Sequence, residues 1–107
     1  MIISTIYFVP KDKIKKIDII ISICSPVQIE NTDWQCGVKI SYNGEITERC
    51  GVGANALDAL VACLFIITVD LNHYAIAHKG HFETKYGTKP FIMKYLQVNR
   101  TNEKHEN

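Results

Sequence analysis

Short hydrophobic runs separated by polar turns fill the first half of the chain, a pattern that indicates β-strands. Residues 2–9 are rich in β-branched and aromatic side chains and stop at Pro10, which predicts a first strand. After a charged turn over residues 11–16, residues 17–29 repeat isoleucine with polar interruptions. This repeat predicts a second strand with one face on the core, and Pro26 is expected near its end or at an edge.

The next segment predicts a β-hairpin. Residues 35–42 alternate hydrophobic and polar side chains, as in a strand with one buried face. The dipeptide Asn43-Gly44 follows directly and tolerates the positive φ angles that both central positions of a type I′ turn require. The returning strand covers residues 45–50 or extends to 52, after which glycine releases the chain into a different element.

A long helix is predicted after the hairpin. Asn55 is a good N-cap, Asp58 lies where its carboxylate meets the partial positive charge of the helix N-terminus, and residues 56–71 contain no glycine or proline. Six residues at helical spacing form an apolar stripe that we expect to face the core: Leu57, Leu60, Val61, Leu64, Ile67 and Leu71. Further apolar residues around the helix indicate that it is covered on more than one side. Residues 72–78 either continue the helix, with Gly80 as its C′ glycine, or begin a loop.

The last third of the chain carries weaker signals. Residues 80–90 have the composition of an irregular segment, and residues 91–98 fit a late strand or a short helix. Residues 99–107 are expected to form a polar, flexible tail. Together these elements predict an α+β fold, a small antiparallel sheet of four or five strands packed against one long apolar helix, in a single domain over residues 1–98.

Composition and charge exclude several classes of protein. The 107 residues suit one small core, and 12 Lys and Arg against 11 Asp and Glu give a charge of +1, unlike that of a strongly basic nucleic-acid binder. The N-terminus lacks the pattern of a secretory signal peptide. The longest strongly apolar run, residues 59–69, is shorter than the ~18 residues that cross a bilayer. We therefore expect a cytoplasmic protein without a membrane span.

Neither a metal site nor a catalytic group can be assembled from the sequence. The chain has four cysteines: Cys24, Cys36, Cys50 and Cys63. They are 12, 14 and 13 residues apart, whereas zinc ligands usually come in close pairs, and without a secretory signal we expect reduced, unpaired thiols. His73, His78 and His81 have acceptable spacing but no carboxylate or cysteine pair beside them. The sequence therefore predicts no metal, no cofactor and no enzymatic activity.

One basic and aromatic segment is a candidate binding surface. Residues 73–100 hold five Lys and Arg against one acidic residue, interleaved with aromatic side chains. Such a segment can bind a protein, can bind RNA or single-stranded DNA through phosphate contacts and base stacking, or can be a solvated loop whose aromatic residues cover the sheet. The residues expected to contact a partner are Lys79, Phe82, Lys85, Tyr86, Lys89, Lys94 and Tyr95.

Two short motifs flank the predicted hairpin. One is Trp34-Gln35-Cys36, and the other is Gly51-Val52 followed by Asn55-Ala56-Leu57-Asp58-Ala59-Leu60. They resemble the motifs Trp-x-Cys and Gly-x-Asp-x-x-Gln-Ala-Leu of a family of small bacterial domains of unknown function. Asn55 stands where that family has Asp and Asp58 where it has Gln, exchanges that preserve a helix-capping role. The size and layout also resemble the immunity proteins that neutralise bacterial toxins, including those of contact-dependent growth inhibition.

The second resemblance implies a non-enzymatic immunity or antitoxin-like protein that binds a cognate toxin and covers its active site. On this hypothesis the toxin presents acidic residues to the segment 73–100. The alternative hypothesis is a nucleic-acid-binding accessory domain that uses the same segment. Salt dependence distinguishes the two, because binding to phosphates weakens steeply as the ionic strength rises.

Overall fold

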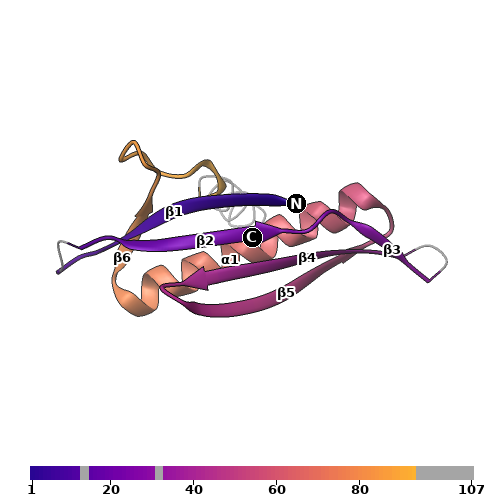
Figure 1. Cartoon of the computed structure of the whole chain (residues 1–107), viewed down its shortest axis with the longest axis horizontal. Coiled ribbons are helices and arrows are strands. Elements are labelled where there is room, and N and C mark those ends of the chain that lie inside the picture. Colours follow the sequence, from indigo (N-terminus) through magenta and orange to yellow (C-terminus); the bar gives the residue numbers. More distant parts are fainter. Residues whose placement is uncertain (13–14, 31–32, 94–107) are drawn as a thin grey trace, which may run out of the picture.

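One antiparallel sheet with a long helix laid across one of its faces makes up the fold (Figure 1). The computed structural model describes residues 1–12, 15–30 and 33–93. The strands and the helix have these bounds: β1 Ile2–Pro10, β2 Ile17–Ile23, β3 Val27–Ile29, β4 Asp33–Tyr42, β5 Glu45–Gly53, α1 Ala56–His78 and β6 Gly80–Glu83. The predicted α+β fold, an antiparallel sheet packed against one long helix, is therefore confirmed.

The strands follow one another as a meander, and α1 then carries the chain back across the sheet to β6, which pairs with β1. β5 pairs with β4 along its whole length, so β2 and β3 lie one after the other along the other side of β4. Every pairing is antiparallel. Among the described residues, β3, β5 and β6 each pair with a single strand, and β5 is the longest of the three.

Glycine and proline chemistry sets the turns between the strands. Asn43 and Gly44 have φ angles of 54° and 95°, which confirms the predicted hairpin between β4 and β5. The single strand predicted over residues 17–29 is instead divided into β2 and β3. Pro26 explains this break, because proline has no N–H to donate to a neighbouring strand.

Both ends of α1 are capped. Asn55 Oδ1 accepts a hydrogen bond from the Asp58 N–H at 2.9 Å, which confirms the predicted N-cap. The longer of the two predicted helices is the one observed, and it ends at Lys79, whose N–H donates to the Ala75 carbonyl. Lys79 has a φ of 51°, so the left-handed residue is Lys79, where the sequence predicted Gly80.

α1 comes closest to the sheet where its side chains are small. The fully buried residues of α1 are Ala59, Cys63, Ile67, Thr68 and Leu71. Gly51 and Gly53 of β5 lie directly beneath the helix, because a Cβ atom at either position would collide with backbone atoms of α1. Of the predicted apolar stripe, Leu57 and Val61 are exposed. The side of α1 that faces the sheet is therefore the one with small residues, and no described residue covers Leu57 and Val61 on its outer side.

Residues 80–83 form β6, where the sequence predicted an irregular segment. Phe82 lies opposite Phe8 of β1 and is buried, with the two ring centroids 5.2 Å apart. Gly80 approaches Phe8 and Val9 so closely that a side chain would not fit. A strand of four residues is too short to show a periodic pattern, so only the pairing with β1 reveals it.

The end of the described chain returns to the core. Residues 91–93 have helical backbone geometry, and Met93 belongs to the core cluster. The remainder of the segment predicted as a late strand or short helix lies outside the described residues, as does the predicted tail over residues 99–107.

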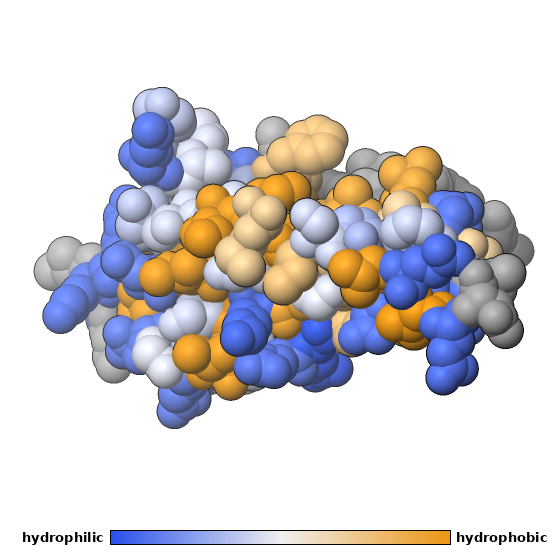
Figure 2. All heavy atoms as spheres, turned by 45° about the vertical axis from the view of Figure 1, so that its right-hand side comes forward, coloured by the Kyte–Doolittle hydropathy of each residue, from blue (hydrophilic) through white to orange (hydrophobic). Residues whose placement is uncertain are grey.

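Hydrophobic residues are also exposed on the surface. Figure 2 shows them gathered in the middle of the molecule, with hydrophilic residues around them. On the face of the sheet that α1 does not cover, the exposed large hydrophobic residues are Ile3, Ile20, Val27, Ile29, Ile46 and Val52. This face is therefore less polar than a fully solvated sheet face.

By length and composition alone, α1 could cross a membrane. Its 23 residues exceed the apolar run that the sequence suggested, because the helix extends well beyond residue 69. Here α1 lies against the sheet with one side buried, and core helices of soluble proteins meet the same criterion. The absence of a membrane span stays a prediction.

Candidate partner-binding surface

Two lysine-bearing segments that are far apart in the sequence meet at one end of the molecule. The Lys11 N–H donates to the Lys79 carbonyl at 2.8 Å, and Pro10 pairs with Gly80 where β1 meets β6. The turn after β1 therefore lies beside the C-terminal end of α1. We use the name basic end for the basic and aromatic residues of this turn, of the cap of α1, of β6 and of the loop that follows β6: Lys11, Lys15, Lys16, Lys79, His81, Lys85, Tyr86 and Lys89.

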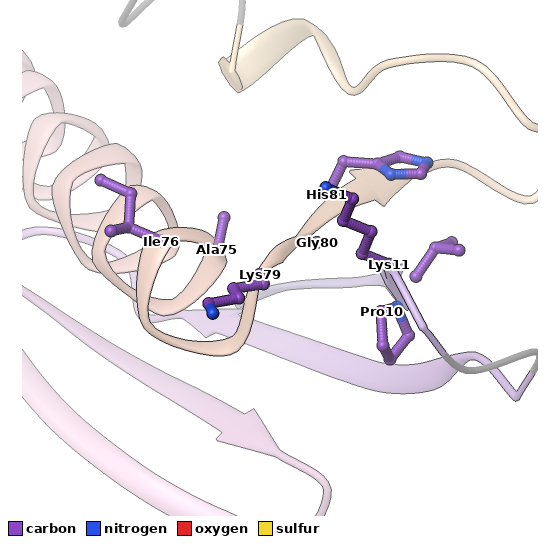
Figure 3. A pocket seen from close by; sticks show the side chains of 8 residues that line it. Pro10, Lys11, Ala75, Ile76, Lys79, Gly80 and His81 are labelled. Atoms are coloured by element: carbon purple, nitrogen blue, oxygen red, sulfur yellow. The ribbon is translucent and has the colours of Figure 1, made fainter.

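An open hollow of about 660 Å³ lies at the basic end (Figure 3). Its lining residues are Val9, Pro10, Lys11, Ala75, Ile76, Lys79, Gly80 and His81. The three basic side chains come from three places, namely the turn after β1, the cap of α1 and β6. Aliphatic and basic side chains around one hollow suit a group with a hydrophobic body and a negative charge.

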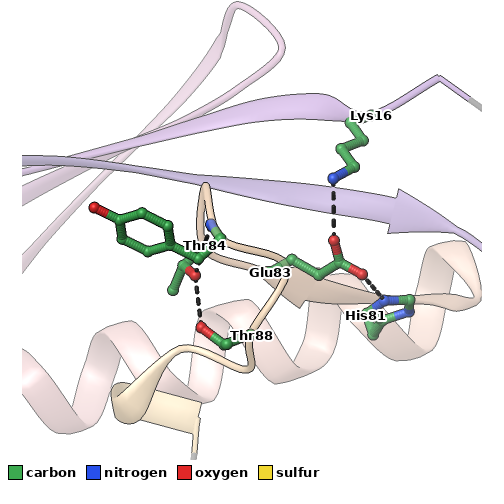
Figure 4. A network of polar contacts seen from close by, with 6 residues as sticks. Lys16, His81, Glu83, Thr84 and Thr88 are labelled. Carbon is green, nitrogen blue, oxygen red and sulfur yellow. Dashed lines mark hydrogen bonds and ion pairs between the residues drawn. The ribbon is translucent and has the colours of Figure 1, made fainter.

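Glu83 of β6 links the two segments of the basic end (Figure 4). Its Oε2 lies 2.8 Å from His81 Nε2, and its Oε1 lies 3.1 Å from Lys16 Nζ. The hydrogen bond with His81, and then the one from Lys16, hold the pKa of the Glu83 carboxyl below its ordinary value of 4.5. Among the described residues no carboxylate pairs with Lys11 or Lys79. These two cations are therefore available to a partner.

The loop after β6 presents an aromatic ring and a cation together. Thr84 Oγ1 and Thr88 Oγ1 lie 2.7 Å apart, and the Gly87 N–H donates to the Thr84 carbonyl at 3.0 Å. These contacts hold the tip of the loop, where Tyr86 is 78% exposed and Lys85 Nζ lies 5.1 Å from the centroid of its ring. Exposed tyrosines and cations of this kind are typical anchors of protein interfaces.

Four of the seven residues predicted to contact a partner belong to the basic end: Lys79 at the cap of α1, and Lys85, Tyr86 and Lys89 in the loop after β6. Phe82 does not, because it is 3% exposed and packs against Phe8 in the core. Its side chain points to the helix side of β6, which the sequence could not show without the pairing to β1. Lys94 and Tyr95 lie outside the described residues.

Several residues of the basic end are missing from the predicted set: Lys11, Lys15, Lys16 and His81. The available signal is the lysine-rich turn over residues 11–16. Nothing local in the sequence connects that turn with the segment 73–100, since the pairing of β1 with β6 is what brings the two together.

The side chains with strongly raised pKa values lie in the core and not at the basic end. Burial, followed by a hydrogen bond with Cys36, raises the pKa of Cys63 to about 12. Burial, followed by the charge of Asp70, raises the pKa of Tyr42 to about 12. Both groups stay protonated near neutral pH, which makes them poor nucleophiles and bases. In the described part of the chain, no group of three or more His, Cys, Asp or Glu side chains could hold a metal ion.

The four cysteines are free thiols. Cys36 and Cys63 are buried between the sheet and α1, and Cys24 and Cys50 are exposed. The Cys36 thiol donates a hydrogen bond to the Cys24 carbonyl at 3.2 Å, so it joins β4 to the segment that follows β2.

The comparison with protein families gives a match to the family described as "Domain of unknown function (DUF6968)". Its model matches residues 8–91. The matched region runs from β1 past the loop after β6, so it includes the hairpin, α1 and the basic end. No curated protein and no solved structure matches the chain significantly.

Proposed function

The chain belongs to the DUF6968 family, and we propose that it is a non-enzymatic immunity protein that binds a bacterial toxin and covers the toxin's active site. One observation carries the proposal: the basic end combines an exposed tyrosine, a hollow lined by aliphatic and basic side chains, and two lysines, Lys11 and Lys79, that pair with no carboxylate among the described residues. Cationic and aromatic anchors around a hollow supply much of the binding energy in protein interfaces. A blocking protein needs such a surface and needs no catalytic group of its own.

The surface of the proposed partner is acidic and carries a hydrophobic side chain. That side chain fills the hollow, and a neighbouring carboxylate pairs with Lys11 or Lys79, which line the same hollow. The net charge of the whole chain is only +1. The attraction therefore comes from the local arrangement of lysines and not from the overall charge.

The test uses the toxin domain encoded by the neighbouring gene, prepared as a catalytically inactive variant. Isothermal titration calorimetry compares the native chain with a Lys11→Gln/Lys79→Asn double variant. Asparagine is chosen at position 79 because it tolerates the left-handed backbone found there. We expect the dissociation constant to rise at least ~10-fold, since the variant removes two cations from the interface.

Lys39→Gln is the matched control. Lys39 is an exposed lysine of β4 that pairs with Glu48 at 3.6 Å, outside the basic end. This control should bind the toxin domain as the native chain does. An unchanged affinity in the double variant, or a neighbouring gene that encodes no toxin, would contradict the proposal.

Nucleic-acid binding is the second candidate function, because Tyr86 offers an exposed ring for a base and Lys85 a cation for a phosphate. The partly aliphatic lining of the hollow favours the protein partner, since a hydrophobic side chain gains from burial there and a phosphate does not. Titration with a single-stranded RNA of about 20 nucleotides decides between the two functions. Binding at physiological salt that weakens steeply as the salt concentration rises would favour the second candidate.

A further inference from the structure

β5 forms an unprotected edge of the sheet. It pairs with β4 over nine residues in one continuous register, and no described strand pairs with its other side. It contains no proline, and its charged side chains, Glu45, Glu48 and Arg49, include no lysine, the residue that most often protects such an edge. β6 at the opposite edge is only four residues long. Among the described strands, β5 is therefore the long edge that is open to another strand.

The free side of β5 offers the backbone groups of four residues. In a two-residue hairpin the residues that flank the turn bond to each other, and the direction of the backbone groups alternates along the strand. Counting from Glu45, the N–H and C=O groups that point away from β4 belong to Ile46, Glu48, Cys50 and Val52. These are the groups that a further strand would bind.

Hydrophobic side chains border this open edge. Ile46 and Val52 are 63% and 55% exposed, and both lie on the face of the sheet that α1 leaves uncovered. A strand that paired with β5 would therefore find hydrophobic side chains on this face of the sheet.

We propose that two copies of the chain associate through β5, in antiparallel pairing about a twofold axis at Arg49, so that one sheet continues across the dimer. In this register Ile46 of each copy lies opposite Val52 of the other. The twofold axis produces this hydrophobic pair twice, which makes the edge complementary to itself. The interface is separate from the basic end, so it does not depend on the proposed function.

Neighbouring registers fit less well. An axis at Glu48 would place two Glu48 carboxylates directly opposite each other, which is destabilising. An axis at Cys50 would place Ile46 opposite Ala54, which lies beyond the end of β5. The axis at Arg49 avoids both, because it places Glu48 opposite Cys50 of the second copy.

The charges on the helix side of the edge also fit this register. The two Arg49 side chains approach each other at the axis, and each already lies 3.4 Å from Asp70 of α1. Asp70 Oδ2 is buried without a hydrogen-bond donor among the described residues. The Asp70 carboxylates therefore supply the negative charge that two neighbouring guanidinium groups require.

Sedimentation velocity of the native chain tests the dimer, and a variant that combines Ile46→Lys with Val52→Lys tests the interface. The variant places like charges opposite each other, and we expect its dimer dissociation constant to rise at least ~100-fold. Ile3→Lys is the matched control, because Ile3 is 64% exposed on the same face of the sheet but lies on β1. This control should dimerise normally. A monomeric native chain, or a double variant that dimerises as tightly as the native chain, would overturn the proposal.

Glu48→Cys tests the register. It places a thiol opposite Cys50 of the second copy at a Cα separation of about 5.5 Å, which a disulfide can span. With diamide as the oxidant, the two thiols give up two hydrogens and form one S–S bond, and we expect a covalent dimer on a non-reducing gel. The same variant with Cys50→Ser should give none. Failure of Glu48→Cys to form the covalent dimer would overturn the register.

Discussion

A Cβ atom at Gly51 would lie 2.5 Å from the backbone nitrogen of Cys63, so β5 and α1 are in backbone contact at this point. The contact sets the height of the helix above the sheet and turns Ala59 and Cys63 inward. The larger side chains of Leu57 and Val61 remain on the outside. A glycine in the sheet thus determines which side of a largely apolar helix is buried.

Gly51→Ala should lower the free energy of unfolding by ~1–3 kcal/mol, because the added methyl group must displace backbone atoms of α1. Urea unfolding gives the change in midpoint. Gly37→Ala is the control, since a Cβ atom there has its closest contact at 4.0 Å, with Cys24 Sγ. The control should change the stability by less than ~0.5 kcal/mol. Equal midpoints for the two variants would show that the close contact does not exist.

Ile67→Ala tests which side of α1 is buried. Ile67 is fully buried, so its truncation should cost ~2–5 kcal/mol through lost burial and a residual cavity. Leu57 has the same apolar character but is exposed, and Leu57→Ala should cost less than ~1 kcal/mol. Chemical denaturation of both variants provides the comparison. A larger loss of unfolding free energy for Leu57→Ala than for Ile67→Ala would show that the apolar stripe predicted from the sequence is the buried side.

Local chemistry explains why parts of this fold could be predicted from the sequence. Asn43 and Gly44 accept positive φ angles, and the Asn55 side chain caps a helix, whatever surrounds them. The buried side of α1 could not be predicted in this way. Apolar residues occur nearly all around the helix, so the sequence does not single out one side. The contact that decides which side is buried comes from Gly51, which lies on a different element.

The same distinction applies to the candidate site. The basic and aromatic character of the segment 73–100 is visible in the sequence, and Tyr86 is exposed as an anchor should be. The contribution of Lys11 is not visible, because it reaches Lys79 only when β1 pairs with β6. Phe82 is misplaced for the same reason, since the register with β1 turns it into the core.

The buried thiol of Cys63 makes the stability depend on alkaline pH. Burial and the hydrogen bond with Cys36 raise its pKa from the ordinary value of 9.0 to about 12, so the unfolded chain loses this proton first as the pH rises. The stabilisation is fully present below pH 9.0 and is lost progressively as the pH rises towards about 12. Urea unfolding from about pH 8 to about pH 10 should show a steeper loss of stability in the native chain than in Cys63→Ala. Parallel pH profiles would contradict this assignment.

Glu83 makes the stability depend on pH in the acidic range, because its pKa is lowered where that of Cys63 is raised. Its pKa is lowered in the folded chain, so its stabilisation is present above the ordinary value of 4.5 and is lost as the pH falls through the lowered value. An NMR titration of the carboxyl group measures this pKa directly. We expect it to rise towards 4.5 in His81→Phe and to rise less in Lys16→Met, because the hydrogen bond with His81 is the largest cause. The reverse order would show that Lys16 dominates.

Amide hydrogen exchange of the chain, with and without the inactive toxin domain, tests most directly whether the basic end binds the partner. We expect the toxin domain to slow exchange at residues 79–89 and at Lys15 and Lys16. Exchange at β3, which lies outside the basic end, should not change. Slowed exchange confined to β3 or to β5, with residues 79–89 unaffected, would contradict the proposed binding surface.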